Sequence, residues 1–442
     1  MSPPTPTAFT QTPDLTRAFE AMEKGGPFVF ITGRAGTGKS TLLRRFRLET
    51  TRKCVFLAPT GVAALNIEGQ TIHLFFGFSP GITVTGARKK ARMMRAEPIY
   101  KKIDTLVIDE LSMVRADLMD CMDAFLRAAR GVKEPFGGVR IVGIGDLFQL
   151  PPVVTAQERG DFARAYPSPF FFGSNSFKQR YDLGEVELIE LTEVFRQRDQ
   201  QFIEILNAIR ERTATSGHFA ILNNQVRDRV EEGAIVLTGT NVAAHAINDA
   251  RLAALKTPTF TIHGTTKGSF KERDMPTSPS LLLKVKARVM FVANDQLGQY
   301  VNGTVGTVEL AQRSGIIVRT DEGKTVHVTA HTWTLYRSTY DQEAGTLGQE
   351  KLGSFTQLPL RLAWAVTIHK SQGKTFDRVH IDLRGGAFAS GQTYVALSRV
   401  RSLPGLTLAA PIGKGHIILD QSVVQFLEEM KVKKGKRQGL GI

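Results

Sequence analysis

Apolar runs and glycine-rich turns alternate along the first 150 residues in the order expected of an α/β protein. The runs 28–32 (FVFIT), 53–58 (KCVFLA), 105–108 (TLVI) and 139–144 (VRIVGI) are mostly apolar. Each has the length of a buried strand, and helical patterns lie between them. Strands that alternate with helices predict a parallel sheet, in which ligands bind beyond the carboxyl ends of the strands.

Two helices in this part of the chain are predicted with particular clarity. The segment 14–25 (DLTRAFEAMEKG) predicts a helix that Asp14 caps and Gly25 ends. The segment 111–130 predicts an amphipathic helix, because its apolar residues recur at steps of three or four. We interpret this stripe as core: Leu111, Val114, Leu118, Met122, Phe125 and Ala129.

A second α/β pattern begins near Glu187, and 442 residues are enough for more than one domain. Short alternating strands with glycine turns across 301–356 predict a small β-barrel inserted into the second domain. The basic tail 431–442 (KVKKGKRQGLGI) predicts disorder. The predicted division is 1–185 for the first lobe with an insertion at about 76–100, 186–300 and 357–430 for the second lobe, 301–356 for the β insertion and 431–442 for the tail.

Charge changes the picture, because 57 Lys and Arg against 42 Asp and Glu give a net charge of +15. Such an excess predicts a polyanion as partner, although a basic soluble protein without such a partner is the alternative. The basic run within 84–95 is either a DNA contact or a solvated helix face.

No stretch of 18 apolar residues and no signal-type leader occurs, which predicts a cytoplasmic protein. Cys54 and Cys121 stand far apart, which favours two reduced thiols over a disulfide or zinc site.

The strongest local motif follows the first predicted strand. Gly33-Arg34-Ala35-Gly36-Thr37-Gly38-Lys39-Ser40 matches G-x-x-x-x-G-K-S and leads into a helical pattern. Strand, glycine loop and helix are the context that this phosphate-binding motif requires. Its glycines let backbone N–H groups point at phosphate oxygens, and the following helix adds its positive dipole end.

The remaining members of this site follow from phosphate chemistry. Lys39 places a cation at the β and γ phosphates, Ser40 offers a hydroxyl to Mg²⁺, and Thr41 is a further phosphate contact. Asp109 and Glu110 end a buried strand, which predicts a Mg²⁺ ligand and a group that polarises the attacking water.

Three residues farther along the chain are candidates for stabilising transferred charge. Gln149, in GDLFQLPP, is placed to sense the γ-phosphate or orient water. Arg196 in TEVFRQ and Arg399 in YVALSRV are candidate arginine fingers, which phosphoryl transfer uses to neutralise its transition state.

The chain resembles the PIF family of superfamily 1 helicases, of the 5′-to-3′ branch, with RecD-type enzymes as near relatives. The resemblance spans residues 28 to 410 and depends on nine segments in family order: FITGRAGTGKST, APTGVAALNIEGQTIHLFFGF, LVIDELSMV, GDLFQLPPV, LTEVFRQ, LTGTNVAAHAIN, LKVKARVMFVANDQLGQYVNGTVG, LAWAVTIHKSQGKTFDRV and YVALSRVRSLPGL.

The resemblance implies an α/β fold of two tandem RecA-like P-loop lobes with parallel sheets, a small wedge loop near 76–85 and an inserted SH3-like β-barrel. ATP and Mg²⁺ would bind between the lobes, with single-stranded DNA across both. By position, the nucleotide would be held by Gly33, Ala35, Gly36, Thr37, Gly38, Lys39, Ser40, Thr41 and Gly373, and the metal by Ser40 and Asp109. Glu110, Lys39, Gln149, Arg196 and Arg399 would be catalytic. DNA would contact Pro59, Thr60, Gly61, His73, Phe75, Phe76, Asn241, Thr367, His369 and Lys370.

Stacking on DNA bases is one interpretation of Phe75 and Phe76, and core packing is the other. The family's adenine-reading Gln is missing from the helix 14–25, and Gln11 lies too early to replace it.

The expected function is an ATP-dependent 5′-to-3′ DNA helicase acting on single strands, single/double-strand junctions, and forked or G-quadruplex DNA. No membrane and no obligate protein partner are expected. The alternatives are a nucleotide-switched DNA-binding or remodelling ATPase without unwinding, or an RNA-directed helicase.

Overall fold

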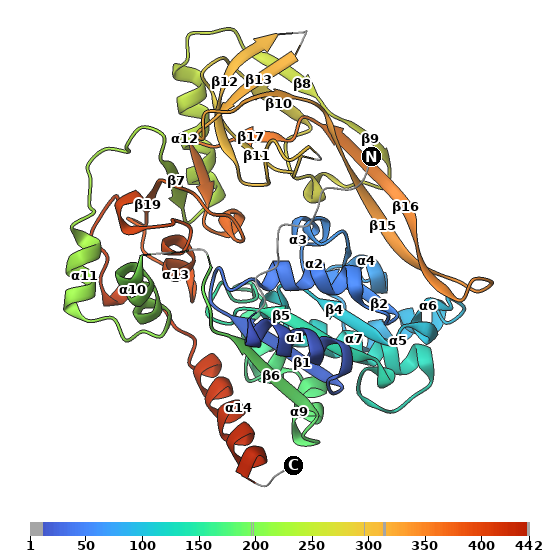
Figure 1. Cartoon of the computed structure of the whole chain (residues 1–442). Helices are drawn as coiled ribbons and strands as arrows, with labels where there is room; N and C mark the ends of the chain where they lie inside the picture. Colours follow the sequence, from blue (N-terminus) through green and yellow to red (C-terminus); the bar gives the residue numbers. More distant parts are fainter. Residues whose placement is uncertain (1–11, 196, 198, 296, 313–314, 440–442) are drawn as a thin grey trace.

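The first lobe is built on a six-stranded parallel sheet (Figure 1). The computed structural model describes residues 12–195, 197, 199–295, 297–312 and 315–439. The strand order is β3-β2-β4-β5-β1-β6, which places β1 between β5 and β6. The strands are β1 (Phe28–Gly33), β2 (Cys54–Ala58), β3 (Gln70–Thr71), β4 (Thr105–Ile108), β5 (Arg140–Gly145) and β6 (Val186–Leu191).

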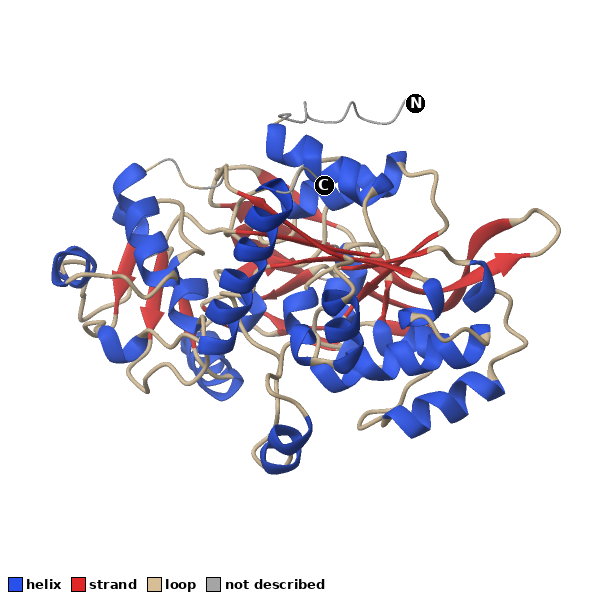
Figure 2. Cartoon of the chain, turned by 90° about the horizontal axis from the view of Figure 1, so that it is seen from below, coloured by secondary structure: helices blue, strands red, loops and turns tan. Residues whose placement is uncertain are grey.

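Helices lie on both sides of this sheet, as the view from below shows (Figure 2). Strands β1, β4 and β5 are buried along their whole length, in agreement with the continuous apolar runs of the sequence. The helices of this lobe are α1 (Pro13–Lys24), α2 (Lys39–Glu49), α3 (Gly61–Asn66), α4 (Ile72–Phe76), α5 (Val84–Met93), α6 (Ile99–Lys102), α7 (Ala116–Arg130), α8 (Arg159–Ala165) and α9 (Asn175–Asp182).

The predicted lobe boundary at residue 186 is wrong, because β6 belongs to the first sheet. It pairs in parallel with β1, with Phe28 opposite Val186 and Gly33 opposite Leu191. Pairing with β6 completes the hydrogen bonding of β1, the strand that leads into the phosphate loop. The chain therefore leaves the first lobe only after residue 191.

The predicted wedge region near 76–100 has a loop at 77–83, followed by helix α5, which carries most of the basic residues. Helix α5 packs on α7 and buries Ala87 and Ala91. Its basic residues Arg88, Lys89 and Arg92 are exposed, as both a solvated helix face and a DNA contact require.

The second lobe contains a smaller parallel sheet of four strands in the order β18-β7-β19-β20. Its helix α13 packs against α10, which follows the first sheet in sequence. The elements are β7 (Ile235–Thr238), β18 (Ala365–Thr367), β19 (Val379–Asp382), β20 (Leu406–Leu408), α10 (Gln200–Arg210), α11 (Ser216–Asn223), α12 (Asn241–Ala254) and α13 (Gln392–Leu397).

The predicted β insertion at 301–356 divides between two antiparallel sheets instead of forming one unit. Strands β11 (Arg288–Phe291) and β17 (Leu360–Leu362), which lie outside the predicted bounds, complete a five-stranded sheet in the order β14-β13-β12-β11-β17. The other strands are β12 (Val305–Gln312), β13 (Gly315–Thr320), β14 (Thr325–Val328), β15 (His331–Asp341) and β16 (Thr346–Gln357), with β9 (Thr265–Gly268) beside β16 and β8 (Phe260–His263) paired with β10 (Ser280–Leu283).

The long hairpin of β15 and β16 reaches back to the first lobe (Figure 1). The Gln70 side-chain amide donates to the Ser338 hydroxyl at 2.6 Å. The ammonium groups of Lys53 and Lys102 lie 5.4 and 5.8 Å from the ring centroid of Tyr340. The hairpin is therefore a second connection between the lobes, separate from the chain crossing after β6.

The C-terminal segment forms a helix, α14 (Gln421–Gly439), so the predicted disorder of 431–442 is wrong for 431–439, and 440–442 lie outside the described residues. The Phe426 ring stacks on Phe172 of the first lobe with centroids 4.4 Å apart, and the Lys433 ammonium lies 3.2 Å from the Tyr181 ring centroid. These anchors on the first lobe stabilise a helix whose basic composition alone suggests no fixed structure. Within the described ranges, no helix is long and apolar enough to cross a membrane.

Candidate nucleotide and nucleic-acid site

The phosphate loop has the backbone conformation that its glycines predict. Gly36 and Gly38 have φ of 85° and 86°, in the left-handed region where other residues are strained. Gly33 is required for a different reason: a Cβ there would lie 2.7 Å from Thr37 Oγ1 and 2.8 Å from the Leu191 carbonyl oxygen. The loop is thus fitted closely against β6 before helix α2 begins.

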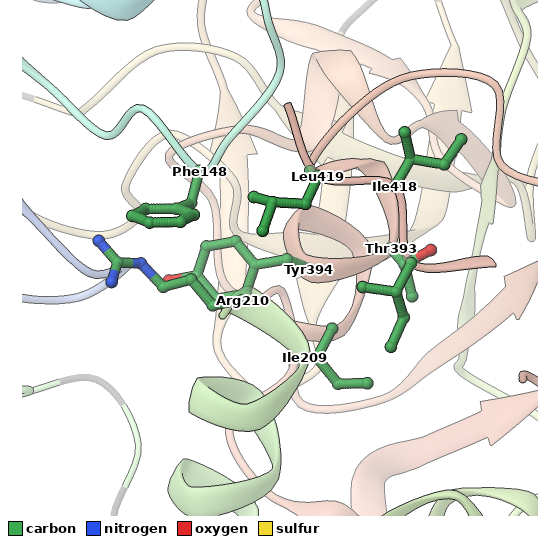
Figure 3. A pocket seen from close by; sticks show the side chains of 9 residues that line it. Phe148, Ile209, Arg210, Thr393, Tyr394, Ile418 and Leu419 are labelled. Carbon is green, nitrogen blue, oxygen red and sulfur yellow. The ribbon is translucent and has the colours of Figure 1, made fainter. Parts of the chain in front are cut away.

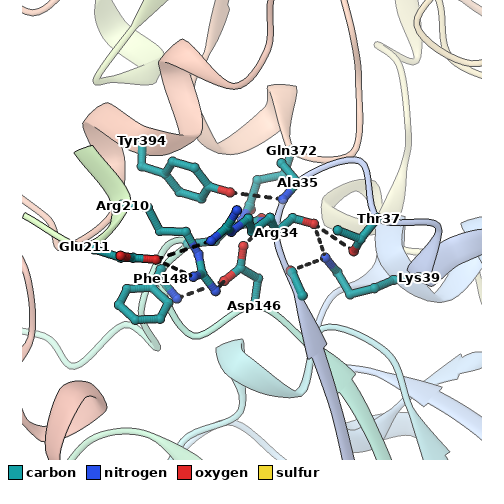
Figure 4. Close-up of polar contacts among 12 residues, drawn as sticks. Arg34, Ala35, Thr37, Lys39, Asp146, Phe148, Arg210, Glu211, Gln372 and Tyr394 are labelled. Atoms are coloured by element: carbon teal, nitrogen blue, oxygen red, sulfur yellow. Dashed lines mark hydrogen bonds and ion pairs between the residues drawn. The ribbon is translucent and has the colours of Figure 1, made fainter. Parts of the chain in front are cut away.

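Lys39 is folded over this loop. Its Nζ donates to the carbonyl oxygens of Gly33 at 2.5 Å and Arg34 at 2.8 Å, and Thr37 Oγ1 also donates to the Arg34 carbonyl (Figure 4). Ser40 and Thr41 follow in the first turn of α2 with exposed side chains. The ammonium, the hydroxyls and the helix N-terminus therefore share one edge of the sheet.

The acidic pair lies in the electrostatic field of that ammonium. Burial raises the pKa of Glu110 to about 7, with a further contribution from the neighbouring Asp109 carboxylate, while Lys39 and Arg399 oppose the rise. Burial likewise raises the pKa of Asp109, and its backbone hydrogen bond from Glu110 and the Lys39 cation oppose this. Glu110 has φ 51° and ψ 40°, a strained conformation for a residue other than glycine. Two carboxylates held close together in this way are suited to a cation and to proton transfer.

Gln149 and Arg399 are both brought toward this site. Gln149 is buried; its Nε2 donates to Asp146 Oδ2 at 3.1 Å, and its Oε1 accepts from Gln372 Nε2 of the second lobe at 3.3 Å. Arg399 is buried, and its guanidinium donates to the carbonyl oxygens of Val395, Ser371 and Lys374. Arg196 lies outside the described residues.

Two second-lobe residues that the sequence did not single out contact the same loops. The Tyr394 hydroxyl accepts a hydrogen bond from the Ala35 backbone N–H at 3.0 Å, inside the phosphate loop (Figure 4). Arg210 pairs with Asp146 at 3.4 Å. Tyr394 could have been found from the sequence, because it lies in the same motif, YVALSRV, as Arg399. Arg210 could not, because it only ends an amphipathic helix and belongs to no motif.

The predicted DNA-binding residues of the first lobe fall into two groups. Pro59, Thr60 and Gly61 join β2 to α3, and Thr60 Oγ1 accepts from the Ala63 N–H as a helix cap. A Cβ at Gly61 would lie 2.7 Å from Asp274 Oδ1, so this turn packs closely against the segment around Asp274. His73 lies in α4 and is partly buried.

Phe75 and Phe76 are core residues, so the prediction that they stack on DNA bases is wrong. Their side chains are 3% and 0% exposed. Their rings pack edge to face at 4.8 Å, and both contact Tyr100. Burial in this aromatic cluster stabilises the first lobe and leaves no ring face for a nucleotide.

The predicted DNA-binding residues of the second lobe lie at the ends of its parallel strands. Asn241 is exposed at the start of α12, after β7, and His369 and Lys370 are exposed after β18. Thr367 is buried, and its hydroxyl accepts from the Lys370 N–H at 3.2 Å, so it shapes this turn. Gly373 follows with φ 75°. The segment that carries these groups also carries Gln372, which contacts Gln149.

Comparisons with known proteins agree with this arrangement. A family profile described as "PIF1-like helicase" matches residues 14–218. The "ATP-dependent DNA helicase Pif1" of Bdellovibrio bacteriovorus is 33% identical over 430 residues, covering 95% of this chain and 92% of that protein. The human "ATP-dependent DNA helicase PIF1" is 38% identical over 86% of this chain, which spans 58% of the human protein.

Solved structures extend the similarity to the whole fold. Bacteroides sp Pif1 in complex with ADP-AlF4 matches with a TM-score of 0.85 and 34% identity, covering 96% of this chain and 98% of that one. Bacteroides Pif1 bound to ssDNA matches with a TM-score of 0.68 and 35% identity, covering 97% and 98%. Because a relative 33% identical is matched over nearly its whole length, this chain belongs to the PIF1-like helicase family.

Proposed function

We propose that the chain hydrolyses ATP between its two parallel-sheet lobes and uses the energy to move 5′-to-3′ along single-stranded DNA and to separate duplex DNA. One observation carries the proposal. Gln149 of the first lobe, beside the acidic pair, is hydrogen-bonded to Gln372 of the second lobe, on the segment that presents His369 and Lys370. A hydrogen bond therefore joins the proposed nucleotide site directly to the segment proposed to bind DNA.

The residues divide the chemistry of hydrolysis among them. Backbone N–H groups of residues 33–38 and the Lys39 ammonium bind the β and γ phosphates. The Glu110 carboxylate accepts a proton from the attacking water, and Gln149 orients that water. The bond between the γ-phosphorus and the bridging oxygen breaks to give ADP and phosphate, while Arg399 offsets the charge that develops.

A divalent cation fits the donor set of this site. The Ser40 hydroxyl and the Asp109 carboxylate are hard oxygen ligands of the kind that Mg²⁺ prefers. The raised pKa of Asp109 shows a carboxylate whose charge is poorly compensated by the protein alone. When bound, Mg²⁺ neutralises charge on the β and γ phosphates.

Lobe motion would connect this chemistry to movement along DNA. In the present arrangement, the Ala35 N–H donates to the Tyr394 hydroxyl, and the Arg399 guanidinium donates to backbone carbonyls of its own lobe. Nucleotide phosphates compete for these same groups, so binding and release alter the contacts between the lobes. Each such change moves the segment 367–374 relative to Thr60 and His73, which are on the other lobe.

The test uses matched duplexes that carry a single-stranded tail on either the 5′ or the 3′ side. The full chain should separate the 5′-tailed duplex with ATP, and Lys39→Ala should separate neither. DNA-stimulated ATP hydrolysis without strand separation would instead support a remodelling ATPase. Stronger stimulation by an RNA oligomer of matched sequence would support an RNA-directed enzyme, since no site residue identified above reads a 2′-hydroxyl.

A further inference from the structure

Arg210 is a buried arginine on the second-lobe side, and it contacts the segment 146–149 that follows β5 in the first lobe. It ends α10, which packs against α13, and it is only 5% exposed. Its Nη2 lies 3.4 Å from Asp146 Oδ1, and its guanidinium lies 4.0 Å from the Phe148 ring centroid (Figure 3). The contact is thus both an ion pair and a cation–π interaction with one short segment.

Asp146 connects Arg210 to Gln149, because its carboxylate is hydrogen-bonded to both side chains. Its Oδ1 accepts from Arg210 and from the Phe148 backbone N–H at 3.1 Å, while its Oδ2 accepts from Gln149 Nε2 at 3.1 Å (Figure 4). Both carboxylate oxygens are therefore engaged, and the Asp146 side chain is 0% exposed. The orientation of this carboxylate fixes which way the Gln149 amide points.

The same end of α10 also contacts the phosphate loop. Glu211 accepts from Arg34 with an Nη2 to Oε1 distance of 3.5 Å and lies 3.8 Å from Arg210 Nη1. Burial lowers the pKa of Arg210, but the facing Asp146, with Tyr394, Glu190 and Glu211, raises it above its ordinary value, so the guanidinium is charged. Two adjacent residues of one helix end thus contact both nucleotide-facing loops of the other lobe.

We propose that Arg210 is a positioning residue for ATP hydrolysis: through Asp146 and Phe148 it holds Gln149 in its working orientation and makes that orientation depend on the second lobe. The inference rests on the role proposed above for Gln149. A guanidinium suits this task, because its plane stacks on the ring while its edge binds the carboxylate. Loss of the cation leaves Asp146 buried without a counter-charge and free to turn away from Gln149.

Kinetic constants distinguish a positioning role of Arg210 from a purely structural one. A residue that only stabilises the fold would lower the melting temperature and the amount of active protein. It would leave the turnover number per folded, nucleotide-binding molecule unchanged. A positioning residue lowers kcat while the KM for ATP stays close to its original value. The orienting contact lies beside the γ-phosphate site, not in the loop that supplies most of the binding.

The experiment is a double-mutant cycle of Arg210→Met and Gln149→Ala, with DNA-stimulated ATP hydrolysis as the readout. We expect Gln149→Ala to lower kcat about 100-fold and Arg210→Met to lower it about 10- to 100-fold. The double variant should be no slower than Gln149→Ala alone, because Arg210 acts through Gln149. Arg210→Lys, which keeps the ion pair but not the planar stack, should recover part of the loss. Arg164→Met, at a side chain 81% exposed, is the control and should retain full turnover.

Besides the unchanged turnover number that marks a purely structural role, three results would overturn the inference. Independent action would make the two losses multiply in the double variant. A purely binding role would raise the KM of Arg210→Met with kcat unchanged. Normal turnover in Gln149→Ala would refute the proposed role of Gln149, and this inference with it, so the two failures are distinguishable. If Arg210→Met does not fold, Arg210→Lys replaces it in the cycle, and the same results decide.

Discussion

Glu110 is held in a site that disfavours its charge, so neutralising it should stabilise the protein while removing its activity. Burial raises its pKa from 4.5 to about 7. At 1.36 kcal/mol per pKa unit, this corresponds to about 3 kcal/mol of unfavourable free energy when the group is ionised. The neighbouring Asp109 carboxyl also has a raised pKa, so part of this free energy belongs to the pair rather than to Glu110 alone. We therefore expect Glu110→Gln to raise the free energy of unfolding by on the order of 1–3 kcal/mol at pH 8.

The pH dependence has a definite sign. Between pH 4.5 and about 7 the folded carboxyl binds more protons than the unfolded one, so the wild-type protein loses stability as the pH rises. The Gln variant lacks this loss. The difference between the two is therefore small at low pH, grows through pH 6 and is complete above pH 7.

Thermal unfolding of the nucleotide-free chain measures this difference. About 1 kcal/mol shifts the melting temperature by roughly 2–4 °C for a domain of 150–250 residues. The melting temperature of Glu110→Gln should exceed that of wild type by more at pH 8 than at pH 6. Its rate of ATP hydrolysis should be at least about 100-fold below that of wild type. Equal melting temperatures at pH 8, or a difference that does not change with pH, would refute the reasoning.

Four further expectations follow from the site, the lobe contacts and the net charge. Lys39→Ala should abolish ATP turnover in a steady-state assay while DNA affinity in a fluorescence titration stays nearly unchanged; retained turnover would contradict the site. Tyr394→Phe removes the acceptor of the Ala35 N–H, so nucleotide should bind more tightly in calorimetry, by up to about 10-fold; weaker binding would show that the hydroxyl serves the nucleotide instead. A disulfide between Gln70→Cys and Ser338→Cys should block DNA unwinding until reductant is added, because it fixes the β15–β16 hairpin on the first lobe; unwinding under oxidising conditions would contradict this. DNA affinity should fall steeply as salt rises, since a net charge of +15 implies phosphate contacts that release counterions, and a flat dependence would contradict that implication.

Much of the first lobe was predictable because its signals are local. Continuous apolar runs predicted β1, β4 and β5, and the glycine motif predicted the loop before α2. The helix start illustrates the limit: Asp14 was expected as the cap, but Thr12 caps α1 and Asp14 accepts from Thr192 instead. Capping by neighbouring residues is nearly isoenergetic, so a tertiary contact decides between them.

The remaining differences come from contacts between distant parts of the chain. The sequence of β6 is equally compatible with the last strand of the first lobe and with the first strand of the second. Only its pairing with β1 shows that it belongs to the first lobe. Helix α14 depends on Phe426 finding Phe172. Arg210 carries no motif, because its role comes from Asp146, which is 64 residues away in sequence. Such features need the folded chain.

Displacement of streptavidin from biotinylated single-stranded DNA tests the central claim most directly, because it reports movement and direction without a duplex. With ATP, the full chain should displace streptavidin from the 3′ end much faster than from the 5′ end, and Lys39→Ala should displace it from neither. Displacement from the 5′ end alone would contradict the proposed direction. Rapid DNA-stimulated ATP hydrolysis without displacement from either end would contradict ATP-driven movement itself.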